Sequence, residues 1–269
     1  MSRVARALMW HELLERTRDR WVLVVSVLFA AMASAVSAYG SAGGHGEAAA
    51  GAALTGPSLV TLASLFVPLV ALVLSHDAIV GERERNTLGL LLSMPVSRTE
   101  VVFAKFIGRG AALALSVALG MGTAIAFAGS AQRSVLISLM LPTLLLGLAF
   151  LAIGLLLSTL APRQSVAASM VVVVWFGLVF FYDLGLLGLL VASDGGVSEN
   201  TIAHLVVANP AGLYRVAMMQ SLLGGQALSD LGLSVELPSV AQRALIWAAW
   251  VIGPTLLSAL ILARKRVLR

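Results

Sequence analysis

Two carboxylates stand within long apolar stretches of the sequence, where an ionised side chain needs a specific reason to be present. Asp77 and Asp183 are these residues, and a charge at the centre of a membrane helix costs about 2.5 to 3.5 kcal/mol on insertion scales. Intramembrane aspartyl proteases use two such carboxylates that share one proton. Tyr182-Asp183 matches half of that pair, but no Gly-x-Gly-Asp supplies the second half. The sequence therefore argues against protease chemistry.

The positions of the two carboxylates indicate structural roles instead. Asp77 lies about one helical turn from the end of its apolar segment, where water, Arg83 or a partner surface could stabilise its charge. We interpret Asp77 as a structural anchor. Asp183 lies beyond the middle of its segment and is followed by two nearby glycines. We expect the helix to end there and Leu184 to Val191 to form a separate short helix.

Other kinds of chemistry find little support in the residue types. A serine protease of the membrane needs a Ser and a His paired inside the bilayer, yet all four histidines fall in leaders, loops or span ends: His11, His45, His76 and His204. The chain has no cysteine, which excludes disulfides and thiolate ligands. The residues whose types suit copper are His45, Glu47, His204, Met218 and Met219. Their spacing matches no closed site, so we predict no metal site. We expect Met218 and Met219 to pack against other apolar residues.

The elements that carry these residues are membrane helices. Hydrophobic residues make up 59% of the 269 residues and charged residues 12%, and the mean hydropathy is +0.96, so a bilayer is the natural solvent. About 20 apolar residues cross a bilayer, and six segments reach that length. We predict spans at Trp21 to Gly40, Pro57 to Val80, Gly110 to Gly129, Ser134 to Ala161, Ser165 to Ala192 and Ala244 to Ala263.

The basic residues indicate the orientation of these spans, because cytoplasmic flanks hold an excess of Lys and Arg. With a cytoplasmic N-terminus, fifteen of the eighteen Lys and Arg fall on the inner side. Only Arg133, Arg215 and Arg243 fall outside. We therefore expect a multi-pass protein of the cell inner membrane with both termini in the cytoplasm. The net charge of +5 comes from short clusters beside apolar spans, so it does not indicate nucleic-acid binding.

The first 20 residues precede the first predicted span. Small residues near Ala33 to Ala38 resemble a signal-peptide cleavage site, but the leader is long and acidic, which favours an uncleaved helix. Val4, Leu8, Trp10, Leu13 and Leu14 follow helical spacing, with charged residues on the other face. We predict an interfacial helix over residues 1–20 that contacts membrane lipid; the alternative is a charged tail that only fixes orientation.

Two longer loops connect the predicted spans on the outer side. Ser41 to Gly56 is rich in Gly, Ala and Ser, which is typical of a flexible connector. Ser193 to Arg243 is long enough for a small outer cap, and Pro210 to Leu223 reads as a short helix. Its expected apolar face consists of Leu213, Val216, Ala217 and Met218.

The inner loop after the second predicted span carries mixed charges, then an apolar run, then a proline. Asn86 or Thr87 could cap a short helix, and Pro95 ends it before Arg98 and Glu100 open the next helix. Such a helix can dock into a groove on a cytoplasmic partner. The candidate docking residues within 82–98 are Glu82, Arg83, Glu84, Arg85, Thr87, Leu91, Leu92, Pro95 and Arg98.

This loop resembles the signature of ABC-2 type permeases, from Gly81 through the Leu-rich run and Pro95-Val96-Ser97-Arg98 to Lys105. The leader motif Glu12-Leu13-Leu14 with Arg18-Asp19-Arg20 and the large loop between the fifth and sixth spans are similar too. The resemblance implies one all-α polytopic domain over 1–269. It also implies that the helix around Thr87 to Pro95 is a coupling helix resting on a separate cytoplasmic ABC ATPase, and that two copies form a homodimer.

No G-x-x-x-x-G-K-[ST] motif occurs in the sequence, so the chain has no visible means of binding ATP. We therefore expect a non-catalytic subunit that binds no cofactor, with ATP and Mg on the partner ATPase. The alternatives are a permease that exports another small molecule or a lipid, and a secondary transporter working alone. The latter usually shows internal repeats and charges at the midplane, and we find neither a repeat nor a buried charge pair in the sequence.

Within the ABC-2 family, the run Asp77 to Glu82 and the segment Ala208 to Arg215 look most like permeases of the systems that mature copper-containing nitrous oxide reductase. The resemblance implies a periplasmic accessory protein that handles copper or sulfur, driven mechanically or supplied with a cargo. Its expected contacts on the outer cap are Pro210, Leu213, Tyr214, Arg215 and Val216.

The predicted topology can be tested because the chain contains no cysteine. Single cysteines at Gly46 and Ser229 should react with a membrane-impermeant thiol reagent in intact cells, because both loops are expected to face outward. A cysteine at Arg85 should react only after the cells are opened. Labelling at Arg85 in intact cells would contradict the orientation.

Overall fold

A computed structural model describes residues 3–17, 47–127, 130–194, 196–230 and 238–264, together with 27, 30, 31 and 34. Nearly all of these residues are helical. The helices are α1 (Arg3–Thr17), α3 (Glu47–Ser75), α4 (Val80–Glu84), α5 (Thr87–Ser93), α6 (Arg98–Phe127), α7 (Ser130–Leu160), α8 (Gln164–Phe176), α9 (Tyr182–Ala192), α10 (Glu199–Ala208), α11 (Pro210–Asp230) and α12 (Val240–Arg264), with a π-helical segment at Gly177–Phe181 between α8 and α9.

Five stretches of the described helices are long and apolar enough to cross a membrane. They are Gly56–Glu84, Arg98–Ala126, Leu136–Leu160, Gln164–Ala192 and Val240–Arg264. These stretches correspond to the second to sixth predicted spans, which confirms a polytopic membrane protein. The first predicted span, Trp21 to Gly40, lies largely outside the described residues.

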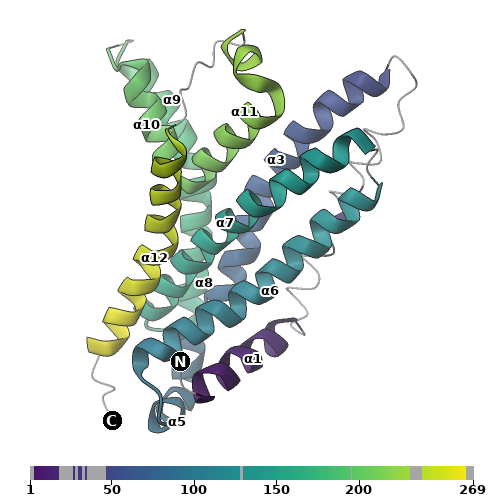
Figure 1. The fold of residues 1–269 in the computed structure, drawn as a ribbon. Coiled ribbons are helices and arrows are strands. Elements are labelled where there is room, and N and C mark those ends of the chain that lie inside the picture. The colour runs from purple at the N-terminus through teal and green to yellow at the C-terminus, as the bar shows by residue number, and fades with distance from the viewer. Residues whose placement is uncertain are drawn as a thin grey trace.

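Three long helices, α3, α6 and α7, form the centre of the bundle (Figure 1). Leu72 of α3, Leu113 of α6 and Phe150 of α7 are fully buried there. The segment from α8 to α9 and the helix α12 lie at the side and expose most of their apolar residues in the single chain. Helices α10 and α11 lie at one end of the bundle, whereas α1, α5 and the last turns of α12 lie at the other. The two candidate regions for partners are therefore at opposite ends.

The prediction of a flexible connector before Pro57 was wrong in part. Residues 41–46 lie outside the described part of the chain, but α3 already begins at Glu47. The segment Ala48 to Ala53 is mostly alanine, the residue with the highest helix propensity. Alanine content therefore outweighs the single glycine of this segment, Gly51.

The helix of the fifth span was expected to end at Asp183, with a separate short helix after it. This expectation was wrong, because the helix continues beyond Asp183. Asp183 lies in the first turn of α9, which runs on past Gly185 and Gly188. The regular α-helix is interrupted earlier, by the π-helical turn over Gly177–Phe181. Turns of this type are rare and widen the helix locally.

The segment between α9 and α12 forms two helices, α10 and α11, which confirms a helical element at Pro210. Helix α11 begins there and extends beyond Leu223 to Asp230. Its first turns are buried against the bundle, since Leu213 and Tyr214 are 0% and 1% exposed. The Tyr214 hydroxyl is hydrogen-bonded to Thr143 of α7 at 2.9 Å. The start of α11 is thus part of the core.

Candidate functional site: a buried charge network

Six charged side chains from four parts of the chain meet at the end of the bundle that carries α1 and α5. Three are acids and three are bases, so their formal charges cancel. We call this group the charge network: Glu12 and Arg16 of α1, Asp77 of the turn after α3, Glu82 of α4, and Lys105 and Arg109 of α6.

Arg109 is the centre of the charge network and is only 1% exposed. Its Nε donates to Glu12 Oε2 at 2.8 Å. Its Nη1 donates to Asp77 Oδ1 at 2.6 Å and to the carbonyl oxygen of Leu74 at 2.7 Å. One guanidinium therefore joins α1, the end of α3 and α6, which suits its rigid, multiply donating geometry.

Lys105 lies one turn earlier on α6 and is fully buried. Its Nζ forms a close ion pair with Glu12 and a second with Glu82 Oε1 at 3.0 Å. Arg16 completes the network, because its Nη2 donates to Asp77 Oδ2 at 2.8 Å. Each acid therefore has at least one basic partner, as a buried ion requires.

Glu12 lies on α1, outside the five candidate membrane spans. Burial raises the pKa of the Glu12 carboxyl, but the positive charges of Arg109 and Lys105 outweigh burial and lower the pKa to about 2. Glu12 is consequently ionised at neutral pH. The contacts of Glu12 with Lys105 and Arg109 are therefore ion pairs and not neutral hydrogen bonds.

Helical spacing explains how two short sequences supply four of these charges. Glu12 and Arg16 are four residues apart on α1, and Lys105 and Arg109 are four residues apart on α6. Residues at this spacing lie on one face of a helix. Gly108 of α6 allows the two faces to meet, because a Cβ there would lie 2.6 Å from the backbone oxygen of Met9.

Helix α1 turns part of its charged face toward the protein. Glu12 and Arg16 are buried, whereas Trp10 is 63% exposed and Leu14 is 47% exposed. Two apolar residues of the predicted lipid-contacting face therefore point away from the bundle, which suits an interfacial helix. The predicted polar face is divided: Arg6 and Glu15 are exposed, but Glu12 and Arg16 serve as internal ion-pair partners.

Asp77 has partners other than the expected one. Arg83 donates instead to the carbonyl oxygens of Ala161 and Thr159 at 3.0 and 3.3 Å. These carbonyls lie at the C-terminal end of α7, where intrahelical partners are lacking. The expectation of no buried charge pair was therefore wrong, because Asp77 pairs with Arg16 and Arg109 and Glu12 pairs with Lys105 and Arg109. The two pairs at four-residue spacing were the signal that could have identified them.

The coupling segment, defined as Glu82 to Arg98, has polar contacts with the bundle at both ends, in addition to those of Glu82 and Arg83 described above. Its first residues follow a turn in which the backbone N–H groups of Ile79 and Val80 donate to Ser158 Oγ at 2.9 and 3.1 Å. Glu84 accepts from the backbone N–H of Gln164, at the start of α8, at 2.9 Å. At the other end, Arg98 donates to carbonyl oxygens in the last turn of α12.

The short helix predicted in this segment is α5, which ends at Ser93 just before Pro95. Asn86 does not cap it through its side chain, and adopts a left-handed conformation with φ of 57°. Thr87 hydrogen-bonds back to Glu82. The turn at Asn86 therefore sets the direction of α5 relative to α4. Asparagine tolerates this left-handed conformation better than most residues.

The predicted docking residues divide into two groups. Glu84, Arg85 and Pro95 are exposed, whereas Glu82, Arg83, Thr87, Leu91, Leu92 and Arg98 are partly buried. Leu92 packs against a small core cluster that includes Leu88. The most exposed apolar residues of the segment are Leu90, at 67%, and Met94, at 42%, which the sequence analysis did not name.

The residues expected to contact an outer partner are mostly internal. Pro210, Leu213 and Tyr214 are buried, so a contact in this conformation is restricted to the partly buried Arg215 and Val216. Arg215 forms an ion pair with Asp183 at 2.5 Å, with side chains that are 28% and 38% exposed. The ion pair accounts for the second intramembrane carboxylate.

Among the described residues, no group of three or more His, Cys, Asp or Glu side chains could hold a metal ion. His204 is exposed, and its Nδ1 lies 2.6 Å from the carbonyl oxygen of Asn200. Met218 and Met219 pack against the core, as expected. His45 lies outside the described residues, and so does the side chain of Glu47.

Loss of one member of the charge network should destabilise the protein strongly. Lys105→Met leaves Glu82 without its basic partner and Glu12 with one partner fewer, and breaking a buried ion pair costs about 3 to 5 kcal/mol. Arg215→Met is the matched control, since a partly exposed pair contributes about 0 to 1 kcal/mol. Thermal unfolding in detergent should show a much larger loss for Lys105→Met. Equal losses would contradict the structural importance of the network.

Comparison with known proteins identifies similar sequences over most of this chain. Residues 6–267 match the model of the ABC-2 family transporter protein. The chain is 37% identical to the probable ABC transporter permease protein NosY of Stutzerimonas stutzeri, over 95% of this chain and 96% of the relative. It is 35% identical to the probable ABC transporter permease protein NosY of Pseudomonas aeruginosa, over 88% of this chain and 89% of the relative.

These matches extend over nearly the whole chain and include every described helix that contributes to the charge network. Permeases of this kind are non-catalytic membrane components, and ATP is bound by a partner ATPase subunit. The chain therefore belongs to the ABC-2 transporter family, as a permease subunit.

Proposed function

We propose that this permease subunit receives a movement from its ATPase at the coupling segment and passes it through the charge network to the membrane helices. The observation that carries this proposal is the exposed apolar end of α5. Leu90 and Met94 expose large apolar side chains beside the charged, exposed Arg85. A short helix with this surface fits a groove on a partner protein.

The attachment of the coupling segment supports transmission of movement. Glu82, at its start, is paired with Lys105, and Arg98, at its end, binds the last turn of α12. A force on α5 thus acts on two spans through polar contacts whose directions are fixed. Rigid elements joined by such contacts move as units.

We further propose that the subunit works as a homodimer in the cytoplasmic membrane, with both termini and α5 on the cytoplasmic side. In the ABC-2 family one set of spans is half of a transporter, and closed two-fold pairs are the commonest assembly. The mostly exposed faces of α8, α9 and α12 offer apolar surface to lipid and to a second copy.

The role that we propose for the assembly is maturation of the copper sites of nitrous oxide reductase, together with an accessory protein outside. Support comes from the sequence resemblance in Asp77 to Glu82 and Ala208 to Arg215 and from the identity to two NosY permeases. Asp77 and Glu82 are both members of the charge network. The alternative within the family is export of another small molecule or a lipid.

Docking at α5 predicts that Leu90→Asp reduces both copurification of the ATPase and ATP hydrolysis by the complex. The added charge opposes burial in an apolar groove, and one misplaced side chain at the centre of an interface often costs 2 kcal/mol or more. The matched control is Asn200→Asp, which adds the same charge on α10 at the opposite end. Unchanged copurification and hydrolysis with Leu90→Asp would exclude α5 as the docking element.

The maturation role predicts the phenotype of a deletion strain in a host that makes the reductase. The reductase polypeptide should still be exported, but with reduced copper or reduced cluster sulfide as measured by metal and sulfide analysis. The native permease should restore the content, and the Leu90→Asp variant should not. A deletion strain whose reductase keeps full metal content and activity would refute this role and favour the export of another molecule.

A further inference from the structure

The outer helix α10 is bound to the fifth span by polar contacts that cluster around the π-helical turn. The buried Asn209, between α10 and α11, donates through Nδ2 to the carbonyl oxygen of Leu178 at 2.7 Å. Tyr182 donates its hydroxyl to the carbonyl oxygen of Leu205 in α10 at 2.7 Å. Leu178 lies within the π-helical turn, and Tyr182 directly follows it.

The two outer helices differ in how they are held. The first turns of α11 are buried in the core, with Tyr214 bonded to Thr143 of α7. Helix α10 has few buried residues, among them Ala203 and Val207. Because α11 is fixed by core packing, α10 is the part of the cap that can follow a movement of the fifth span.

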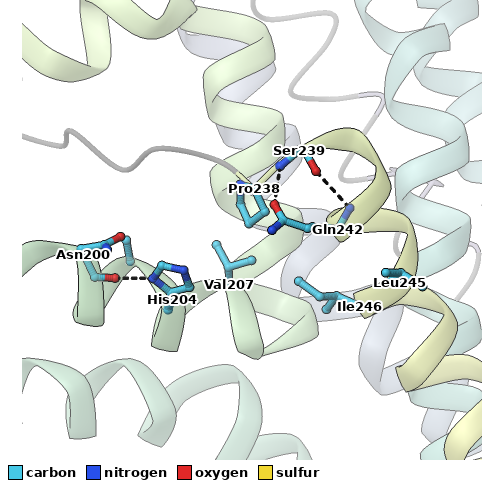
Figure 2. A pocket seen from close by; sticks show the side chains of 9 residues that line it. Asn200, His204, Val207, Pro238, Ser239, Gln242, Leu245 and Ile246 are labelled. Carbon is cyan, nitrogen blue, oxygen red and sulfur yellow. Dashed lines mark hydrogen bonds between the residues drawn. The ribbon is translucent and has the colours of Figure 1, made fainter.

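The other side of α10 is loosely packed. A cavity of about 460 Å³ separates it from the first turns of α12 (Figure 2). Asn200 and His204 line it from α10, and Gln242 lines it from α12. One hydrogen bond spans this side, from Trp250 Nε1 to the carbonyl oxygen of Ala208 at 2.9 Å. Space for α10 to shift therefore exists toward α12.

The fifth span also has a fixed contact at its inner end, where Gln164 donates its backbone N–H to Glu84. Glu84 belongs to α4 and lies within the coupling segment. Between its two ends the span contributes few buried residues, and Trp175 Nε1 donates to the carbonyl oxygen of Leu65 in α3 at 3.0 Å, just before the π-helical turn. The span therefore connects the proposed ATPase-docking region with α10, and its π-helical turn is a natural hinge.

We propose that Asn209 and Tyr182 are positioning residues that attach α10 to the π-helical turn, so that a movement begun at the coupling segment displaces α10 relative to α11. This inference rests on the proposed coupling to an ATPase. In this arrangement α10 is the element that moves at the outer end of the permease. The fifth span connects α10 with the coupling segment.

The test uses the complete complex with its ATPase in lipid nanodiscs and measures the distance between spin labels on α10 and α11. Cysteines at the exposed Thr201 and Ser221 carry the labels, and a non-hydrolysable ATP analogue is added. We expect the analogue to change this distance in the parent chain. Tyr182→Phe should reduce the change, and Tyr182→Phe combined with Asn209→Asp should abolish it, with ATP hydrolysis retained.

The choice of substitutions separates attachment from folding. Asn209→Asp keeps the side-chain oxygen that accepts from the backbone N–H of Ala211 at 3.1 Å and replaces the amide donor to Leu178 by a carboxylate oxygen, which the carbonyl oxygen of Leu178 repels. Tyr182→Phe removes a single hydroxyl, so it tests the inference even if the double variant fails to assemble. Trp250→Phe is the matched control and should keep the full distance change, because it cuts the contact to α12 and not to the fifth span.

A full distance change in Tyr182→Phe, or its loss in Trp250→Phe, would overturn the assignment. A complex that hydrolyses ATP but shows no change in the parent chain would also overturn it, while coupling to the ATPase would stand. A chain that neither binds the ATPase nor affects its hydrolysis would refute the proposed function itself.

Discussion

The structure depends on the need to neutralise ionised side chains that are removed from water. Lys105 and Arg109 are almost completely buried, and neither charge could be accommodated on α6 alone. The compensating acids come from three other places: Glu12 from α1, Asp77 from the turn after α3, and Glu82 from α4. Removal of any one of these elements takes an ion-pair partner away from Lys105 or Arg109. Helix α1 and the coupling segment are consequently bound to the bundle by the same requirement.

This constraint divides the molecule into a firmly joined end and a more adaptable end. Helices in lipid gain little from apolar contact with each other, because lipid is equally apolar, so polar contacts and close packing decide how they associate. At the end with α1 and α4, ion pairs link four elements in fixed directions. At the other end, α10 is held by a few hydrogen bonds beside a cavity. A movement imposed at the joined end would thus leave its ion pairs intact and displace α10 at the adaptable end.

Hydropathy predicted five of the spans because a membrane helix needs only length and apolar composition. The sequence also indicated Asp77 as a candidate anchor, but it did not indicate Arg16 and Arg109 as the partners of Asp77. Lys105 and Arg109 were counted among the basic residues of the cytoplasmic side, which assumes that water surrounds them. Their four-residue spacing instead places both side chains on the face of α6 that meets α1. The π-helical turn at Gly177–Phe181 left no recognisable signal, because its backbone is stabilised by contacts such as Asn209 with Leu178 that join distant parts of the chain. Burial of Tyr214 likewise follows from packing in the core that α3 and α7 form, which helical periodicity alone cannot assign.

The most direct test of the central claim is the distance between α1 and α4 within one protomer, measured with spin labels at the exposed positions His11 and Arg85. Labelled chains are diluted with unlabelled chains, so that only the intramolecular distance is observed. If the charge network joins both helices to α6, the distance distribution is narrow and does not change when the ATPase binds nucleotide, and Glu12→Gln broadens it. A distance that changes with nucleotide in the native chain, or one that stays narrow in Glu12→Gln, would contradict the account.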